Sequence, residues 1–142
     1  MPDQPVIGVI MGDPCGIRPE VLVKAVVDPS AERPSAHLFA IGSASAMQQA
    51  ARAHGNGLRV RQVERAEDLG FQGGHLDVLD PGTLDVTQIR FGQVSTACGR
   101  AVVEWRALGA LAVAQGHAHA LVQGCWRRPK TEPLMRGMPS QN

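Results

Sequence analysis

The pattern of apolar and polar residues along the chain predicts five β-strands, with helices between some of them. Short apolar runs at 6–11, 37–41 and 118–122 have the length and composition of strands buried in a parallel sheet. Apolar and polar residues alternate at 58–63 and 75–80, which is typical of strands with one exposed face. We expect the strand at 58–63 to lie nearer an edge of the sheet.

Helices are predicted between these strands. Pro19 suits the start of a helix that follows the first strand after a tight turn. Ser43 can cap a helix over 44–53, and Ser95 can cap a longer helix from 96 to about 115. This alternation predicts an α/β fold, with a mostly parallel sheet and flanking helices. An apolar stripe on the longest helix comprises Cys98, Val102, Trp105, Leu108, Leu111 and Ala112.

Composition narrows the class of protein. A chain of 142 residues, 44% hydrophobic and 19% charged, suits one globular domain. The net charge of +1 argues against a nucleic-acid partner, and the apolar run at 6–11 is too short to span a bilayer. Asp3 near the start, without a basic region, argues against a secretory signal. An odd set of cysteines without short-range pairing, Cys15, Cys98 and Cys125, fits a reducing compartment, so we expect a cytoplasmic protein.

The turn between the first strand and the first helix carries the main candidate chemistry. Asp13 offers a carboxylate at the carboxyl end of a strand, where ligands bind in open α/β sheets. The N–H groups at the start of the helix can also face an anion. Gly16 can adopt a positive φ that a residue with a Cβ would resist. The alternative is that Asp13 only organises the turn and Glu20 complements the helix dipole. The spacing matches neither the dinucleotide fingerprint nor the phosphate loop.

Other candidate groups have competing structural explanations. Cys15 is either a reactive thiol near a helix start or a small turn residue, and Cys98 is expected in the core. Arg127, Arg128 and Lys130 can bind a phosphate or simply form part of a solvated tail. The histidines show no ligand spacing, so we predict no metal site built only from His37, His54, His75, His117 and His119.

Residues 11–20 carry a family resemblance. Their sequence, M-G-D-P-C-G-I-R-P-E, resembles the M-G-D-P-A-G-I-G-P-E signature near the start of the 4-hydroxythreonine-4-phosphate dehydrogenases, the PdxA-like proteins. The segments 91–95, 99–101 and 114–122 resemble the second conserved region of this family, in the same order. The resemblance covers residues 6–123. It implies part of a fold like that of isocitrate and isopropylmalate dehydrogenases, usually in a homodimer whose active-site cleft is completed by the partner.

The same resemblance implies an activity. The family oxidises a secondary alcohol with NAD, followed by decarboxylation, in pyridoxine and pyridoxal phosphate biosynthesis, and uses a divalent metal (Zn or Mg) bound by histidines. The implied substrate is a small phosphorylated or carboxylated alcohol such as 4-phosphohydroxy-L-threonine. The residues that the resemblance assigns to cofactor binding are Gly12, Asp13, Pro14 and Gly16.

Departures from the family pattern limit what is expected of this chain. Arg18 replaces a glycine, which places a bulky cation in the tight turn, and Cys15 replaces an alanine. The pattern is lost after Val122, so residues 1–123 are expected to form the amino-terminal α/β portion and 124–142 a divergent irregular tail. The family's metal-binding histidines lie beyond Asn142. We therefore expect a truncated chain that is inactive alone, with no catalytic or metal-binding residue assigned. The alternative is a non-catalytic interaction or anion-binding α/β domain.

Overall fold

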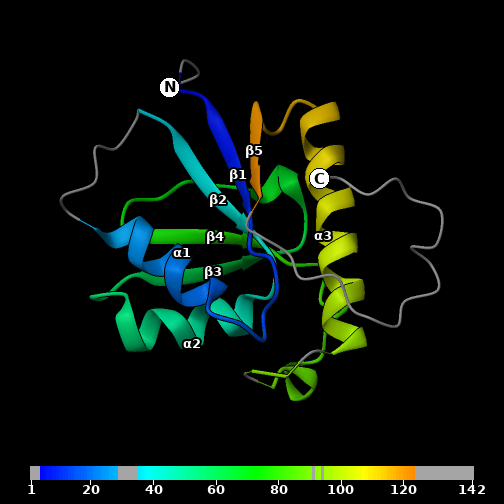
Figure 1. The fold of residues 1–142 in the computed structure, drawn as a ribbon. Coiled ribbons are helices and arrows are strands. Elements are labelled where there is room, and N and C mark those ends of the chain that lie inside the picture. The colour runs from blue at the N-terminus through cyan, green and yellow to red at the C-terminus, as the bar shows by residue number, and fades with distance from the viewer. Residues whose placement is uncertain (1–3, 29–34, 91, 94, 124–142) are drawn as a thin grey trace.

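The chain folds around a five-stranded parallel sheet with helices on both faces (Figure 1). A computed structural model describes residues 4–28, 35–90, 92–93 and 95–123. The strand order is β3-β4-β2-β1-β5, and every described pairing is parallel. The expected α/β class is confirmed. The strands are β1 (Val6–Ile10), β2 (His37–Ile41), β3 (Arg59–Val63), β4 (His75–Leu79) and β5 (Ala120–Gln123).

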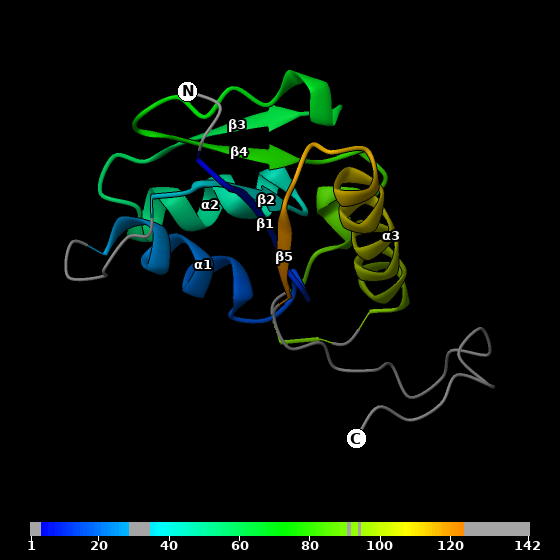
Figure 2. The ribbon, with the colours of Figure 1, turned by 90° about the horizontal axis from the view of Figure 1, so that it is seen from above.

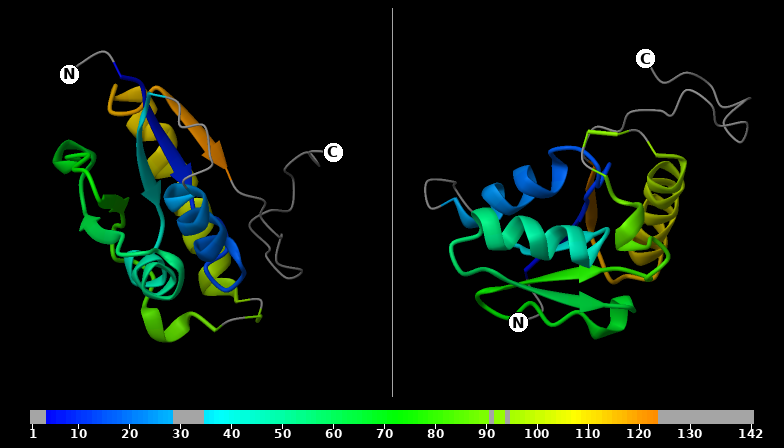
Figure 3. Two further views of the ribbon diagram at one scale, coloured as in Figure 1. Left: turned by 90° about the vertical axis from the view of Figure 1, so that its left-hand side faces the viewer. Right: turned by 90° about the horizontal axis from the view of Figure 1, so that it is seen from below.

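The two faces of the sheet carry different helices. Helix α1 (Arg18–Val27) packs beside α2 (Ala44–His54) on one face, and α3 (Thr96–Ala114) crosses the opposite face against β1, β2 and β5 (Figures 2 and 3). Short 3₁₀ turns occur at Ala66–Asp68 and Val86–Gln88. None of the helices in the described ranges is long and apolar enough to cross a membrane.

Both predicted serine caps are confirmed. Ser43 Oγ accepts a hydrogen bond from Ala46 N at 3.2 Å, and Ser95 Oγ accepts one from Cys98 N at 3.4 Å. Each bond satisfies an N–H that has no carbonyl partner in the first turn of a helix. The local sequence therefore determines where α2 and α3 begin.

Small residues let the layers approach closely in the core. A Cβ on Gly8 in β1 would lie 2.9 Å from Phe39 Cζ, and Phe39 is fully buried in the neighbouring strand. A Cβ on Gly109 in α3 would lie 3.1 Å from Leu121 Cδ1 and 3.2 Å from Ile41 Cδ1. Both glycines thus leave the space that large apolar side chains of the adjacent elements fill.

Arg61 in β3 and Asp77 in β4 link the edge strand to its neighbour. Arg61 Nε and Nη2 donate to the two carboxylate oxygens of Asp77 at 2.8 Å each, while Gly70 N donates to Asp77 Oδ2 at 2.8 Å. Burial alone would raise the pKa of Asp77, but the hydrogen bonds from Arg61, Gly70 and Phe71 outweigh it and lower the pKa. This pair ties β3 to the sheet at its edge, where the alternating pattern predicted it.

Three expectations about buried surfaces are wrong. The alternating run at 75–80 was expected to have one exposed face, but β4 lies between β3 and β2, and residues 76–79 are all buried. The run at 118–122 was expected to form a buried strand, but β5 is at the sheet edge and pairs with β1, and Val122 is 53% exposed. Leu111 was expected on the buried stripe of α3 and is 50% exposed. The face of α3 that meets the sheet continues through Trp105, Gly109 and Ala112, which places Leu111 beside it, toward solvent. Hydrophobicity alone does not separate these positions.

Candidate functional site

The strand order creates a crevice at one point of the sheet. From β1 the chain passes through α1 to β2 on one side, whereas α3 leads to β5 on the other side of β1. The two helices lie on opposite faces (Figure 3). Ligands in open α/β sheets bind beyond the carboxyl ends of the strands at such a switch point. The turn that follows β1 therefore occupies the position where a ligand site is expected.

The turn from Met11 to Ile17 is held by its own polar groups. Gly12 has a φ of 78°, a conformation that residues with a Cβ rarely adopt. Asp13 Oδ1 then accepts a hydrogen bond from Cys15 N at 2.9 Å, and Asp13 O accepts one from Gly16 N at 3.3 Å. Gly16, where a positive φ was also possible, does not adopt one, because the chain reverses directly at the end of the strand, at Gly12. Asp13 thus has a structural role in closing the turn.

Arg18 does not intrude on this turn. The turn ends at Ile17, and Arg18 is the first residue of α1, half-buried in a regular helical position. The expectation that it places a bulky cation within the tight turn is therefore wrong. Pro19 follows in the first turn of the helix, as predicted.

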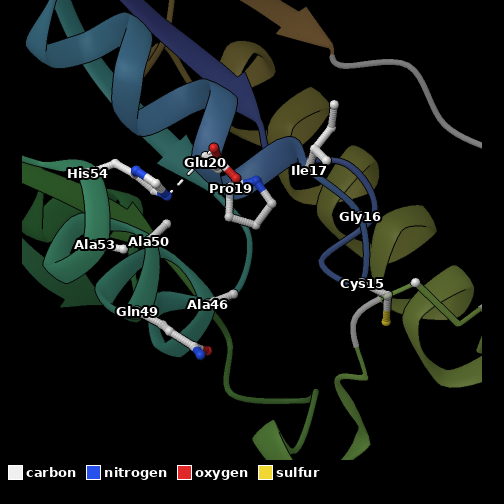
Figure 4. A pocket seen from close by; sticks show the side chains of 11 residues that line it. Cys15, Gly16, Ile17, Pro19, Glu20, Ala46, Gln49, Ala50, Ala53 and His54 are labelled. Atoms are coloured by element: carbon white, nitrogen blue, oxygen red, sulfur yellow. Dashed lines mark ion pairs between the residues drawn. The ribbon is translucent and has the colours of Figure 1, made fainter.

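A cavity of about 330 Å³ opens between the turn, the start of α1 and one face of α2 (Figure 4). Of the four residues assigned to cofactor binding, Gly16 lines this cavity, while Gly12, Asp13 and Pro14 are not part of its wall. A Cβ on Gly16 would find no atom nearer than 3.8 Å, so a ligand has room to approach the backbone here. The wall contributed by α2 consists of Ala46, Gln49, Ala50, Ala53 and His54.

The contribution of α2 was missed by the sequence analysis. Its small residues recur at spacings of three and four, which places them on one side of a helix. That pattern indicates a face on which another helix can approach closely, and α1 packs there. The spacing of these small residues does not show whether the face of α2 is fully packed against α1 or leaves a cavity beside it.

Glu20 supplies the acidic group of the cavity. Its carboxylate accepts a hydrogen bond from Lys24 Nζ at 2.7 Å and lies 3.5 Å from His54 Nε2 (Figure 4 shows the His54 pair). The Lys24 hydrogen bond, with the charges of Lys24 and His54, lowers the pKa of Glu20. The carboxylate is therefore charged near neutral pH, and a cation or hydrogen-bond donor suits this wall better than a free anion.

Cys15 and Cys98 meet beside the turn. Their Sγ atoms are 2.9 Å apart although the residues are separated by 83 positions, and both thiols are free. Asp13 completes a group whose donor atoms all lie within 4.8 Å of one another. Burial, followed by the hydrogen bond with Cys15, raises the pKa of the Cys98 thiol to about 12. Sequence analysis placed Cys98 in the core, which is confirmed, but it did not bring the two cysteines together.

The histidines are dispersed and have separate contacts. His119 Nδ1 accepts a hydrogen bond from Val6 N at 2.9 Å, and the ring of His37 stacks on Phe71 with centroids 4.7 Å apart. His117 Nε2 lies 3.6 Å from a Glu67 carboxylate oxygen. Within the described ranges no three histidines come together as ligands. Arg127, Arg128, Lys130 and the expected tail at 124–142 lie outside the described residues.

Comparison with known proteins relates this chain to a group of dehydrogenases. No protein-family model matches the chain. D-threonate 4-phosphate dehydrogenase of Cupriavidus necator is 35% identical over 101 residues, which are 71% of this chain and 30% of that protein. The chain thus spans less than one third of the length of this curated relative.

Solved structures show the same relation. The 4-hydroxythreonine-4-phosphate dehydrogenase of Burkholderia phymatum matches with a TM-score of 0.78 and 27% identity, over 87% of this chain and 37% of that one. The enzyme of the same name from Klebsiella pneumoniae matches in fold, with a TM-score of 0.74 and 19% identity over 87% of this chain and 38% of that one. Over about 72% of its length, this chain is a homologue of part of the 4-hydroxythreonine-4-phosphate and D-threonate 4-phosphate dehydrogenases, the PdxA-like proteins.

Proposed function

We propose that this chain forms the amino-terminal portion of an NAD-dependent dehydrogenase that oxidises a small phosphorylated or carboxylated secondary alcohol. The observation that carries the proposal is the Met11–Glu20 signature, which lies at the switch point of a sheet homologous to those of PdxA-like enzymes. Substrates of the class named for the relatives, hydroxythreonine and threonate phosphates, are the first to test.

In this proposal the turn and the cavity bind part of the cofactor. Gly12 lets the chain leave the sheet sharply, and the bare backbone at Gly16 allows close approach of a ligand. A cavity of about 330 Å³ is at the small end of ligand sites, so it suits one portion of a dinucleotide. NAD, when bound, supplies the hydride acceptor. The residues of this chain contribute its binding and orientation.

The family's metal does not fit the described residues. The family binds its ion through histidines, and here the histidines occupy separate places in the fold. The Asp13, Cys15 and Cys98 group is rich in sulfur, which is unsuited to Mg²⁺, and its two sulfurs, 2.9 Å apart, are closer than the about 3.8 Å between two thiolates on one zinc. The proposal therefore assigns no metal ligand and no metal-dependent step to this part of the chain.

Turnover by this chain alone is expected to be absent. Among the described residues, Cys15, Glu20 and His54 line the cavity but do not come together as a group of metal ligands, and no lysine or arginine lines the cavity to bind a substrate phosphate. The test combines the purified chain with NAD, Mg²⁺ or Zn²⁺, and either 4-phosphohydroxy-L-threonine or D-threonate 4-phosphate, and follows NADH formation. Metal-dependent NADH production would contradict this expectation and show that the chain holds a full active site.

Cofactor binding is tested separately by calorimetric titration with NAD. Ala50 is half-buried in the cavity wall, and Ala50→Phe is expected to weaken NAD binding at least tenfold by filling the space. Ala107→Phe makes the same substitution on the exposed side of α3, and is expected to leave binding unchanged. Equal affinity in the two variants would refute the role of the cavity.

The second candidate is a non-catalytic interaction domain. It is favoured by apolar side chains exposed on α3 and β5, namely Val103, Leu111, Val113 and Val122. The dehydrogenase proposal assigns this surface to a homodimer in the cytoplasm. If light scattering shows a stable monomer at high concentration, this would argue against both the interaction domain and the homodimer. Calorimetry with phosphate tests the alternative of an anion-binding domain.

A further inference from the structure

Two cysteines from distant parts of the chain are held in contact at the switch point of the sheet. Cys15 belongs to the turn after β1, and Cys98 to the first turn of α3. Their Sγ atoms are 2.9 Å apart, and the two residues are 2% and 1% exposed. This contact stands independently of the proposed dehydrogenase function.

The backbones on both sides of the contact are fixed by hydrogen bonds. Cys15 O accepts from Gly92 N at 2.8 Å, and Cys15 N donates to Asp13 Oδ1 at 2.9 Å. Cys98 N donates to the Ser95 cap at 3.4 Å. The two thiols therefore remain close without any rearrangement of the fold, which is the condition for rapid bond formation between them.

The distance favours a covalent bond over a metal ion. Two thiolates on one tetrahedral zinc lie about 3.8 Å apart, from Zn–S bonds of about 2.3 Å, so zinc would have to push these sulfurs apart. A disulfide requires a separation of about 2.05 Å, so its formation brings these sulfurs closer together instead of apart. Asp13 Oδ1 already accepts the hydrogen bond that closes the turn, which leaves the carboxylate less free to act as a third ligand.

We propose that Cys15 and Cys98 form an intramolecular disulfide that cross-links the β1–α1 turn to α3 when a low-molecular-weight disulfide is present as the oxidant. Cys15 reacts first, since it lines the cavity beside the turn. The residue is 2% exposed, so in this proposal the oxidant reaches its sulfur when the turn opens locally. The Cys15 thiolate attacks one sulfur of the oxidant, forms a mixed disulfide and releases one thiolate.

The Cys98 thiolate then attacks Cys15 Sγ and expels the second thiolate of the oxidant. In total the two cysteine thiols lose two protons and two electrons, and the oxidant takes up both and becomes two thiols. Cys98 is largely protonated at neutral pH, so this second step accelerates as the pH rises. The product joins the two elements that flank the switch point.

The test uses the whole chain and its three cysteines. The reduced protein is incubated with oxidised glutathione, alkylated under denaturing conditions and analysed by intact mass and peptide mapping. Cys15 and Cys98 are expected to be joined and to take up no alkylating agent, while Cys125 is either alkylated or carries one glutathione, which the intact mass shows.

Matched variants separate this cross-link from other oxidation. Cys125→Ser is expected to retain the cross-link, and Cys15→Ala and Cys98→Ser to abolish it while preserving the circular dichroism of the fold. The same oxidation in urea is the control, because an unfolded chain favours the shorter Cys98–Cys125 loop.

Three results would overturn the proposal. One is a native protein that joins Cys125 instead. Another is a glutathione adduct on Cys15 or Cys98 that never resolves, or full alkylation of both of these cysteines after oxidation. The third is a finding that one equivalent of Zn²⁺ protects Cys15 and Cys98 of the reduced protein from both alkylation and oxidation, because this would identify a metal site.

Discussion

Replacement of Gly42 by alanine tests how the end of β2 holds the candidate site. Gly42 follows β2, and a Cβ there would lie 2.7 Å from Met11 Cβ, immediately before the turn. Carbon atoms in contact prefer about 3.5–4.0 Å, so the two must separate by about 1 Å. Both carbons are attached directly to the backbone, and no change of rotamer relieves the contact.

The backbones around this contact resist such a shift. Met11 N donates to Ile41 O at 2.9 Å, and Gly42 N donates to Leu79 O at 3.1 Å. Overpacking by one carbon typically costs about 1–3 kcal/mol, and a contact between two backbone-anchored carbons belongs near the top of this range. We therefore expect Gly42→Ala to lower the free energy of unfolding by about 2–3 kcal/mol.

Urea unfolding followed by far-ultraviolet circular dichroism measures this loss. With an m-value of about 2 kcal/mol per M, the midpoint is expected to fall by about 1–1.5 M with little change in slope. Gly73→Ala is the matched control, because a Cβ there meets nothing within 4 Å. It is expected to change the free energy of unfolding by less than about 0.5 kcal/mol.

Two outcomes would refute this explanation. Equal midpoints for Gly42→Ala and Gly73→Ala would show that the contact costs nothing. Full rescue by Met11→Ala, which removes the flexible end of the methionine and keeps its Cβ, would show that Met11 Sδ and Cε, 3.1 Å away, cause the strain instead.

Two further predictions concern the edge strand and the turn. Asp77→Asn is expected to lower the free energy of unfolding by about 2 kcal/mol, because the carboxylate holds charge-assisted bonds from Arg61 and a bond from Gly70. The pKa of Asp77 is lowered in the folded state, so the stability that this carboxylate contributes is present above its unfolded pKa and is lost as the pH falls through its folded pKa. In urea titrations below pH 4, the free energy of unfolding should therefore fall less in the variant than in the wild type. Gly12→Ala is expected to lower the free energy of unfolding by about 1–2 kcal/mol, because Gly12 has a φ of 78°, whereas Gly16→Ala should be tolerated. Thermal unfolding of the two variants measures the difference. Equal losses of stability would contradict the assignment of the chain reversal to Gly12.

The elements of the fold were predictable because their signals are local. Ser43 and Ser95 cap their own helices, and the alternating residues at 58–63 and 75–80 identified two strands, although the same pattern occurs in the edge strand β3 and the interior strand β4. Pro19 marks the start of α1. Each of these signals depends on a few neighbouring residues, so no knowledge of the rest of the chain is needed.

The turn after β1 was also recognised from its residues, although they did not show which glycine takes the positive φ. A positive φ is possible at Gly12 and at Gly16, and only the exit of the strand from the sheet selects between them. The exposure of Val122 was likewise decided by the position of β5 at the edge, which an apolar sequence does not reveal.

Patterns within short segments were therefore enough to predict the elements, their caps, the parallel α/β class and the signature turn, because these depend on local periods and spacings. The strand order, the cavity between the turn and α2, and the contact of Cys15 with Cys98 follow from how distant elements pack. The two cysteines are 83 residues apart, and they meet because α3 crosses the sheet and begins at the carboxyl end of β1. Such a contact depends on how distant elements pack, and no local pattern encodes it.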